Sequence, residues 1–111
     1  MTADLSQVVA QSADAAELHA PAPTLLLELQ TLLGMLSATV TAETDRGRRP
    51  FRPGPDWPQR FGDLAYGMYL LADQTGVDVA DAVLRTAARV SGSAAPAGSP
   101  PVNSDWFEER R

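Results

Sequence analysis

The sequence contains no cysteine, no lysine and a single histidine, His19. Without cysteine the chain can form no disulfide, thiol nucleophile or cysteine-ligated metal site, and we expect a reducing compartment. With one histidine and no cysteine, His/Cys metal clusters and Ser-His-Asp catalysis are set aside, and no glycine-rich phosphate loop is present. Because His19 stands beside a proline-rich break at residues 20–23, we expect a solvated loop residue rather than a ligand or a general base.

The sequence also lacks a signal-peptide pattern, and no apolar run looks long enough to cross a bilayer. We therefore expect a cytoplasmic protein without a membrane partner. The formal net charge of −5 argues against nucleic acid as a partner. At 111 residues the chain is one small domain, and its many Ala and Leu residues favour an all-α fold.

Two helices joined by a tight turn are predicted between residues 56 and 90. Asp56 suits the N-cap of the first helix, and Pro58 suits its first turn. Gly76 suits a left-handed end, and Asp78 suits the N-cap of the second helix. The apolar positions expected to face inward are Phe61, Leu64, Ala65, Met68, Leu71 and Ala72, followed by Val79, Ala82, Val83, Thr86, Ala87 and Val90.

A longer helix is predicted from an N-cap at Thr24 to residue 45. Its packed seam is expected at a and d spacing, through Leu26, Leu29, Leu33, Leu36 and Val40. A second apolar face is formed by Leu25, Leu32 and Met35, so this helix needs burial on two sides. Because so small a monomer has too few helices to cover it, we predict a homodimer, with a tetramer left open. Gly34 is the expected point of a close helix approach.

The two ends of the chain are less apolar. Residues 4–18 predict a modest amphipathic helix, with Leu5, Val8, Val9, Ser12, Ala16 and Leu18 inward. A helical domain is thus expected over residues 1–90. Residues 91–111 are rich in Ser, Gly, Ala and Pro and predict a flexible tail, ending in an aromatic segment, DWFEERR, that is either disordered or docks on a partner.

Between the long helix and Pro58 lies a loop rich in proline, glycine and arginine. It is interpreted as a solvated connector, with phosphate recognition by Arg46, Arg48, Arg49 and Arg52 as the alternative. Tyr66 and Tyr69 lie off the main apolar face of the next helix. A dimer interface is preferred for them over a platform for stacking bases.

One stretch carries a family resemblance. A Gly-Asp-Leu at residues 62–64, an aromatic and Leu-rich run, and then LLADQTGVDVADAV at residues 70–83 resemble the MazG-like, all-α nucleoside triphosphate pyrophosphohydrolases. The similar region covers roughly residues 24–90 when the long helix is included. The resemblance implies a bundle of about four helices, completed by dimerisation, and Mg²⁺-dependent release of pyrophosphate from a nucleotide.

The resemblance also implies a set of metal-binding carboxylates, Glu-x-x-Glu on the long helix and Glu-x-x-Asp on the next. Here Asp63 matches the final Asp, while Arg60 stands where a metal-binding Glu is expected. Glu28 matches the first Glu in one register, which places Thr31 on the second. Glu28 and Asp63 are therefore the candidate metal ligands and would hold Mg²⁺ weakly, because Arg60 adds positive charge beside them.

Three arginines are candidates for binding nucleotide phosphates directly: Arg60, Arg85 and Arg89. The leading hypothesis is a catalytically weak or inactive MazG-like protein that acts as a nucleotide-binding or protein-interaction module. One alternative is an active Mg²⁺-dependent pyrophosphohydrolase that draws ligands from Glu28, Asp63, Glu43 or Asp45. The other is a small helical adaptor that binds a partner through its C-terminal tail.

Overall fold

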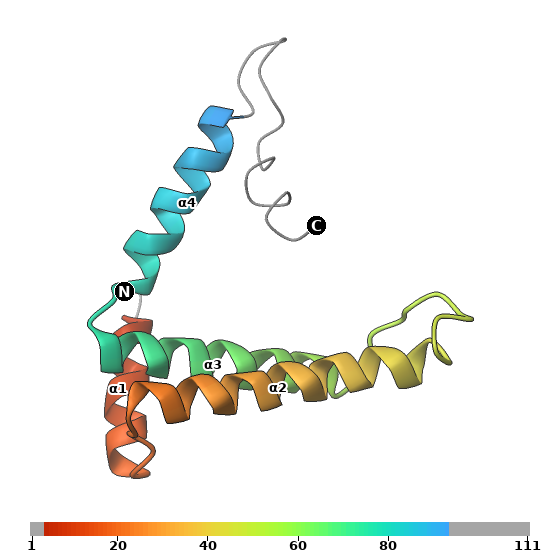
Figure 1. Cartoon of the computed structure of the whole chain (residues 1–111), viewed down its shortest axis with the longest axis horizontal. Helices are drawn as coiled ribbons and strands as arrows, with labels where there is room; N and C mark the ends of the chain where they lie inside the picture. The colour runs from red at the N-terminus through yellow and green to blue at the C-terminus, as the bar shows by residue number, and fades with distance from the viewer. Residues whose placement is uncertain (1–3, 94–111) are drawn as a thin grey trace. The chain divides into compact units, whose positions relative to one another are not determined.

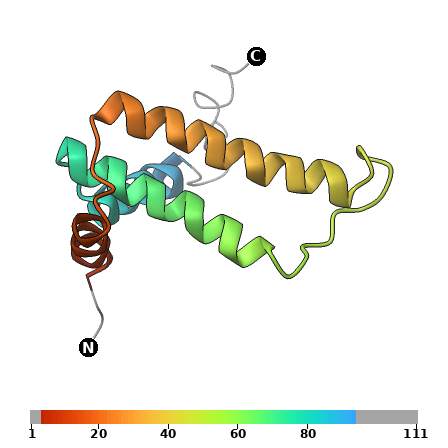
Figure 2. The same cartoon turned by 90° about the horizontal axis from the view of Figure 1, so that it is seen from below.

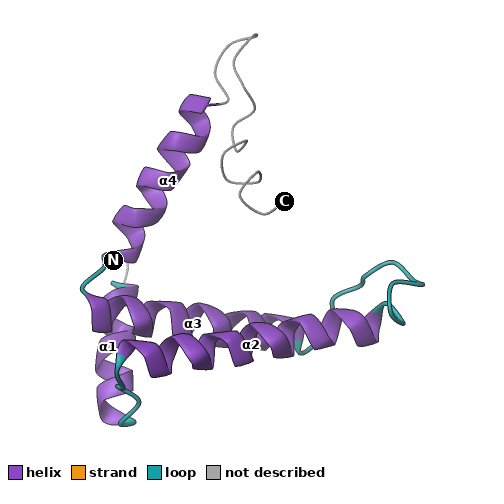
Figure 3. Cartoon of the chain, viewed as in Figure 1, coloured by secondary structure: helices purple, strands orange, loops and turns teal. Residues whose placement is uncertain are grey.

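The computed structural model describes residues 4–93, and these residues form four helices and no strand (Figures 1 and 3). The helices are α1 (Leu5–Ala15), α2 (Ala22–Glu43), α3 (Trp57–Thr75) and α4 (Val79–Ser93). The prediction of an all-α fold of about four helices is thereby confirmed. The aromatic segment DWFEERR lies outside the described residues.

The chain divides into two units, Met1–Val77 with α1, α2 and α3, and Asp78–Arg111 with α4. The turn predicted before the second unit is present. Gly76 has a φ of 74°, and the Val77 N–H donates to the carbonyl of Ala72 at 2.9 Å. Asp78 caps α4, since its Oδ1 accepts from the Asp81 N–H at 3.0 Å. The helix then extends past the predicted end at Val90, to Ser93.

The starts of the other helices follow from local chemistry. Asp4 caps α1 by accepting from the Ser6 N–H at 3.1 Å. Asp56 precedes α3 as predicted, with Pro58 in the first turn, although its side chain makes no cap hydrogen bond. The predicted N-cap at Thr24 is wrong, because α2 begins at Ala22 after Pro21. A proline in the first turn has no N–H to satisfy, so the helix can start one turn earlier without a side-chain cap.

On length and composition alone, α2 is apolar enough to cross a membrane, which corrects the expectation that no segment is. The same test is passed by core helices of soluble proteins and by signal sequences, and α2 lies near the N-terminus. Only 11% of its apolar window is buried inside the described structure. Most residues of this helix are therefore at least partly exposed within the described structure.

The first unit has a small core where α1 crosses the antiparallel pair α2–α3 (Figures 1 and 2). Among the described residues it consists of Val9, Ala13, Leu25 and Leu70, with Ala20, Tyr66, Tyr69 and Leu71 packed against it. The inward face predicted for α1 was mostly wrong, since Leu5, Val8 and Leu18 are exposed. Ala13 is fully buried instead, because only a small side chain lets α1 approach so closely.

The packed seam of α2 keeps Leu29, Leu36 and Val40 of the predicted one, and Leu25 and Leu32 replace Leu26 and Leu33. Leu25 and Leu29 are buried, whereas Leu26 and Leu33 are exposed. Leu29 and Leu32 face α3 at Gly67, where an added Cβ would lie 2.8 Å from Leu29 Cδ2 and 3.2 Å from Leu32 Cδ1, whereas Leu25 packs in the core cluster with α1. A helix that is apolar all round has no preferred face of its own, so the residue opposite selects the face.

Gly67→Ala is expected to destabilise the first unit by about 1 kcal/mol, although alanine is the better helix former. The added methyl group meets Leu29, whose side chain is already buried and cannot move freely. Gly34→Ala is the matched control, because nothing lies within 4 Å of its Cβ position, and it should stabilise by up to about 1 kcal/mol. Chemical denaturation of both variants measures the difference, and equal effects would exclude the close approach at Gly67. The predicted role of Gly34 in close packing is not found inside the described chain.

Candidate functional site

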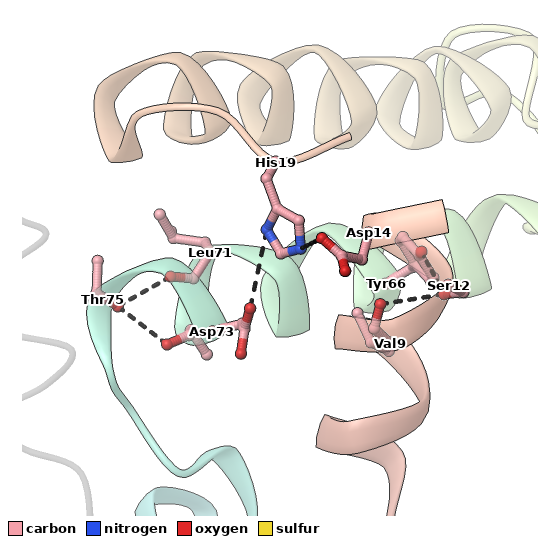
Figure 4. Close-up of polar contacts among 9 residues, drawn as sticks. Val9, Ser12, Asp14, His19, Tyr66, Leu71, Asp73 and Thr75 are labelled. Atoms are coloured by element: carbon pink, nitrogen blue, oxygen red, sulfur yellow. Dashed lines mark hydrogen bonds and ion pairs between the residues drawn. The ribbon is translucent and has the colours of Figure 1, made fainter. Parts of the chain in front are cut away.

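The two tyrosines of α3 serve the core rather than an outer surface. Tyr66 and Tyr69 pack against the core cluster, and the Tyr66 hydroxyl lies 2.6 Å from Ser12 Oγ of α1 (Figure 4). Ser12 Oγ also lies 3.1 Å from the Val9 carbonyl, to which it donates. Assigning these tyrosines to a dimer interface or to base stacking was therefore wrong. Their polar ends let α1 bond to α3 across a thin core.

Tyr66→Phe is expected to cost about 1 kcal/mol of unfolding free energy, because it removes the hydroxyl that meets Ser12. Tyr69→Phe is the matched control, since the structure shows no side-chain hydrogen bond for it among the described residues. Ser12→Ala should cost a similar amount, and the double variant should cost less than the sum. Additive effects in urea denaturation would show that the two hydroxyls do not interact.

His19 joins the connection between α1 and α2 to the end of α3. Its Nε2 lies 4.0 Å from Asp14 Oδ1, and its Nδ1 lies 3.8 Å from Asp73 Oδ2 (Figure 4). His19 is an exposed loop residue, as predicted from the sequence, and its side chain keeps 30% of its exposure beside these carboxylates. These distances exceed hydrogen-bond lengths, so the contacts are electrostatic and strongest when the imidazole is protonated.

The register of α2 against α3 decides where the candidate metal ligands lie. Gly67 stands opposite Leu29 and Leu32, so in this antiparallel pair Asp63 lies near the level of Met35. Glu28 lies about seven residues before that level, roughly 10 Å along the pair. In addition, each side chain leans toward the N-terminus of its own helix, and these directions diverge.

The register therefore does not bring Glu28 and Asp63 together, and both side chains are exposed. Two oxygens bound to one Mg²⁺ must lie within about 4 Å of each other. Among residues 4–93 no group of three or more His, Asp or Glu side chains is arranged to hold a metal. Of the further acids considered, Asp45 pairs with Arg48 at 3.5 Å, and Glu43 lies against Gly54.

The three candidate phosphate-binding arginines are distributed over both units. Arg60 is half-buried on α3, one turn before Asp63. Arg85 and Arg89 are exposed on α4, and Arg85 Nε donates to Asp81 Oδ2 at 2.8 Å. Arg85 thus has a carboxylate partner within its own helix, which a phosphate would have to displace. The assignment of these three residues to a nucleotide stays a prediction.

The loop between α2 and α3 has a defined turn at its start. The Thr44 side chain is buried, its Oγ1 donates to the Val40 carbonyl at 2.7 Å and accepts from the Gly47 N–H at 3.0 Å. Asp45 and Arg46 both have positive φ, at 50° and 59°, which disfavours non-glycine residues. This turn sets the direction in which the chain leaves α2. The exposed arginines of the loop project from the chain that follows it.

The packing of the described residues leaves an apolar surface of α2 and α3 uncovered. Leu26 and Leu33 of α2 are 51% and 52% exposed, and Phe61 and Met68 of α3 are 56% and 52% exposed. Because α2 and α3 are antiparallel and meet at Gly67, helix geometry projects these four side chains from the same side of the pair. We call them the open face.

The pattern of the open face is that of a helix-packing surface. On each helix its two members are seven residues apart, which is the spacing of a coiled-coil seam. Half-buried apolar side chains lie between and beside them: Leu36, Leu64 and Leu71. A signal for this surface existed in the sequence, since Phe61 and Met68 were placed on the apolar face of α3. The predicted homodimer already places the long helix and the helix after Pro58 at an interface; the structure adds which of their apolar side chains remain exposed.

Comparison of the chain with protein-family models, with curated proteins and with solved structures finds no match.

Proposed function

We propose that this protein is a MazG-like helical module that acts by association, as a homodimer, and is catalytically weak or inactive as a pyrophosphohydrolase. The observation that carries the proposal is the open face, where four large apolar side chains are each about half exposed. Their burial against a second copy would stabilise the assembly by about 1–2 kcal/mol for each side chain. Within the described residues no large side chain is fully buried, so the unit gains core by pairing.

The test of association is the mass of the protein in solution over a dilution series, measured by light scattering. We expect a dimer at micromolar concentration that dissociates on dilution. A monomer at every concentration would refute the proposal. A mass of four chains would leave the open face as one of two interfaces, because a closed tetramer needs a second surface.

The reduced-activity part of the proposal is supported by the register of the carboxylates and by Arg60 beside Asp63. We expect calorimetric titration with Mg²⁺ to give no heat, and deoxynucleoside triphosphates with Mg²⁺ to release no pyrophosphate above background. Asp63→Asn should behave as the unsubstituted chain does. Turnover that disappears in Asp63→Asn would overturn this part of the proposal and would establish the active enzyme instead.

A further inference from the structure

An apolar stripe along α4 stays exposed in the described structure. Residues 80–92 are all exposed, and Val83 and Val90 keep 59% and 37% of their exposure. The sequence periodicity predicted that the stripe faces inward, but only Val79 is half-buried. A helix of 15 residues is marginally stable in water unless its apolar face is packed. Burial of the stripe against a partner surface would therefore stabilise α4.

The stripe has the spacing of a seam between two paired helices. Its members follow one another at intervals of four, three and four residues, as the a and d positions of a coiled coil do: Val79, Val83, Thr86 and Val90. Thr86 fits such a seam because its hydroxyl donates to the Ala82 carbonyl within α4, at 3.0 Å. The residues that flank the seam, Ala82 and Ala87, are small, so a second helix can approach closely. We call the four members the α4 seam.

The α4 seam is complementary to a reversed copy of itself. Its intervals read the same from either end, so a second α4 in antiparallel orientation places Val79 against Val90 and Val83 against Thr86. Both copies then contribute the same residues, as a two-fold interface requires. No other partner helix has to be assumed to fill the seam.

The charges of α4 match the same antiparallel pairing. The charged residues between positions 78 and 93 are two acids followed by two arginines: Asp78, Asp81, Arg85 and Arg89. Arg85 is already paired with Asp81 inside the helix, at 2.8 Å. In the antiparallel pair, Arg89 lies on the same flank as the partner's Asp78 and about 3 Å from it along the helix axis. Asp78 donates nothing there and accepts only from the Asp81 N–H among the described residues, so its carboxylate can also accept from an arginine.

We propose that α4 binds α4 of a second copy of this chain in antiparallel orientation, through the α4 seam and with Arg89 of each helix beside the partner's Asp78. The formal charges between positions 78 and 93 sum to zero, which gives α4 no attraction to a nucleic acid or an anionic membrane. A second copy matches both the seam and the order of the charges.

This pairing is separate from the open face and does not depend on it. Three valines and a threonine bury less apolar area than the leucines, phenylalanine and methionine of the open face, so the pairing is the weaker of the two. It is populated above the micromolar concentrations at which the open face acts. There it links two open-face dimers, because each chain then has two different two-fold interfaces.

Two neighbouring substitutions on α4 test the seam. Val83→Glu places a carboxylate in the seam, whereas Leu84→Glu makes the same change at a residue that is 68% exposed and points away from the seam. Both are made in a chain that carries Leu33→Glu, so that the open face does not contribute. Sedimentation equilibrium up to millimolar concentration should show a reversible dimer for Leu33→Glu alone and with Leu84→Glu. Val83→Glu should raise the dissociation constant of that dimer at least about tenfold, since the carboxylate enters the seam twice.

The outcomes separate this proposal from the homodimer through the open face. A Leu33→Glu chain that stays monomeric up to millimolar concentration would refute the pairing of α4, whatever the open face does. Equal dissociation constants for Val83→Glu and Leu84→Glu would exclude the seam. If Val83→Glu leaves the mass unchanged but lowers the free energy of unfolding, the stripe is covered by the chain itself and the proposal is wrong. An unsubstituted chain without a micromolar dimer would refute only the open-face interface.

Arg89→Glu in the same Leu33→Glu chain tests the orientation. It should weaken the dimer about tenfold at about 50 mM salt, because the new carboxylate would face the partner's Asp78. The effect should shrink at about 0.5 M salt, where charges are screened over a few ångströms. Circular dichroism verifies that each variant keeps its helix content. A dimer that is unchanged by Arg89→Glu at low salt would overturn the antiparallel orientation.

Discussion

Leu33→Glu is expected to convert the dimer into a monomer, with a dissociation constant raised at least about a hundredfold. Leu33 lies in the middle of α2 and is 52% exposed, so the substitution disturbs little inside the protomer. In a two-fold dimer the change occurs twice, and each copy loses about 1–2 kcal/mol of apolar burial. The new carboxylates would also have to be desolvated against an apolar surface.

Leu27→Glu is the matched control for this prediction. It makes the same substitution in the same helix at a residue that is 63% exposed, but Leu27 projects away from α3 and from the open face. Sedimentation equilibrium should therefore give a normal dimer for Leu27→Glu and a monomer for Leu33→Glu. If both variants dissociate equally, or neither does, the open face is not the interface.

Leu25→Ala is expected to lower the free energy of unfolding by about 2–4 kcal/mol, which is a large part of the stability of so small a domain. Leu25 is 3% exposed and is the α2 member of the core cluster, in which α1 meets the helix pair. Its truncation leaves a cavity that the small neighbours Ala13 and Ala20 cannot fill. We expect α1 to detach first, because its buried contacts are few.

Leu27→Ala is the control for this variant, and its effect should stay within about 0.5 kcal/mol, since its side chain is exposed. Urea denaturation followed by circular dichroism measures both, at one protein concentration because folding and association are linked. A Leu25→Ala protein that unfolds within about 1 kcal/mol of the unsubstituted chain would contradict the assignment of the core.

The sequence predicted the ends of helices well where a single residue determines the local backbone conformation. Gly76 and Asp78 fixed the turn before α4, and Asp56 with Pro58 fixed the start of α3. These residues act locally, through a left-handed φ, a cap or a missing N–H, so their effect does not depend on the rest of the fold. The start of α2 was missed because two prolines there replaced the cap that Thr24 seemed to offer.

The buried face of each helix was harder to predict than the helix itself. The burial of Leu25 instead of Leu26 on α2 depends on α1, which packs against it, and the burial of Leu29 depends on Gly67, which is far away in sequence and carries no side chain to show where it packs. Tyr66 seemed to lie off the apolar face of α3, but α1 covers that side and supplies Ser12 for the hydroxyl. Long-range contacts of this kind leave no periodic signal in either segment.

The sequence predicted what kind of site to expect, but not where its side chains lie. The excess apolar surface of α2 and α3 indicated a partner chain, and the structure adds which side chains remain exposed. The carboxylates Glu28 and Asp63 were matched to a family pattern by sequence spacing alone. Spacing within one helix is fixed, but the register between two helices is set by their packing, and Gly67 places these two acids at different levels.

A distance measured between the two copies of a dimer tests most directly whether they pair through the open face. The chain has no cysteine, so Ser37→Cys gives a single site for a spin label. Ser37 is exposed, lies one turn after Leu33 and bonds to its carbonyl at 3.0 Å. If two copies pair through the open face, pulsed electron resonance should find the two labels of a dimer within about 20 Å of each other, since roughly 10 Å separates packed helices. Labels more than about 35 Å apart in a dimer, or no pairing at all, would contradict it, because the 22 residues of α2 span about 33 Å.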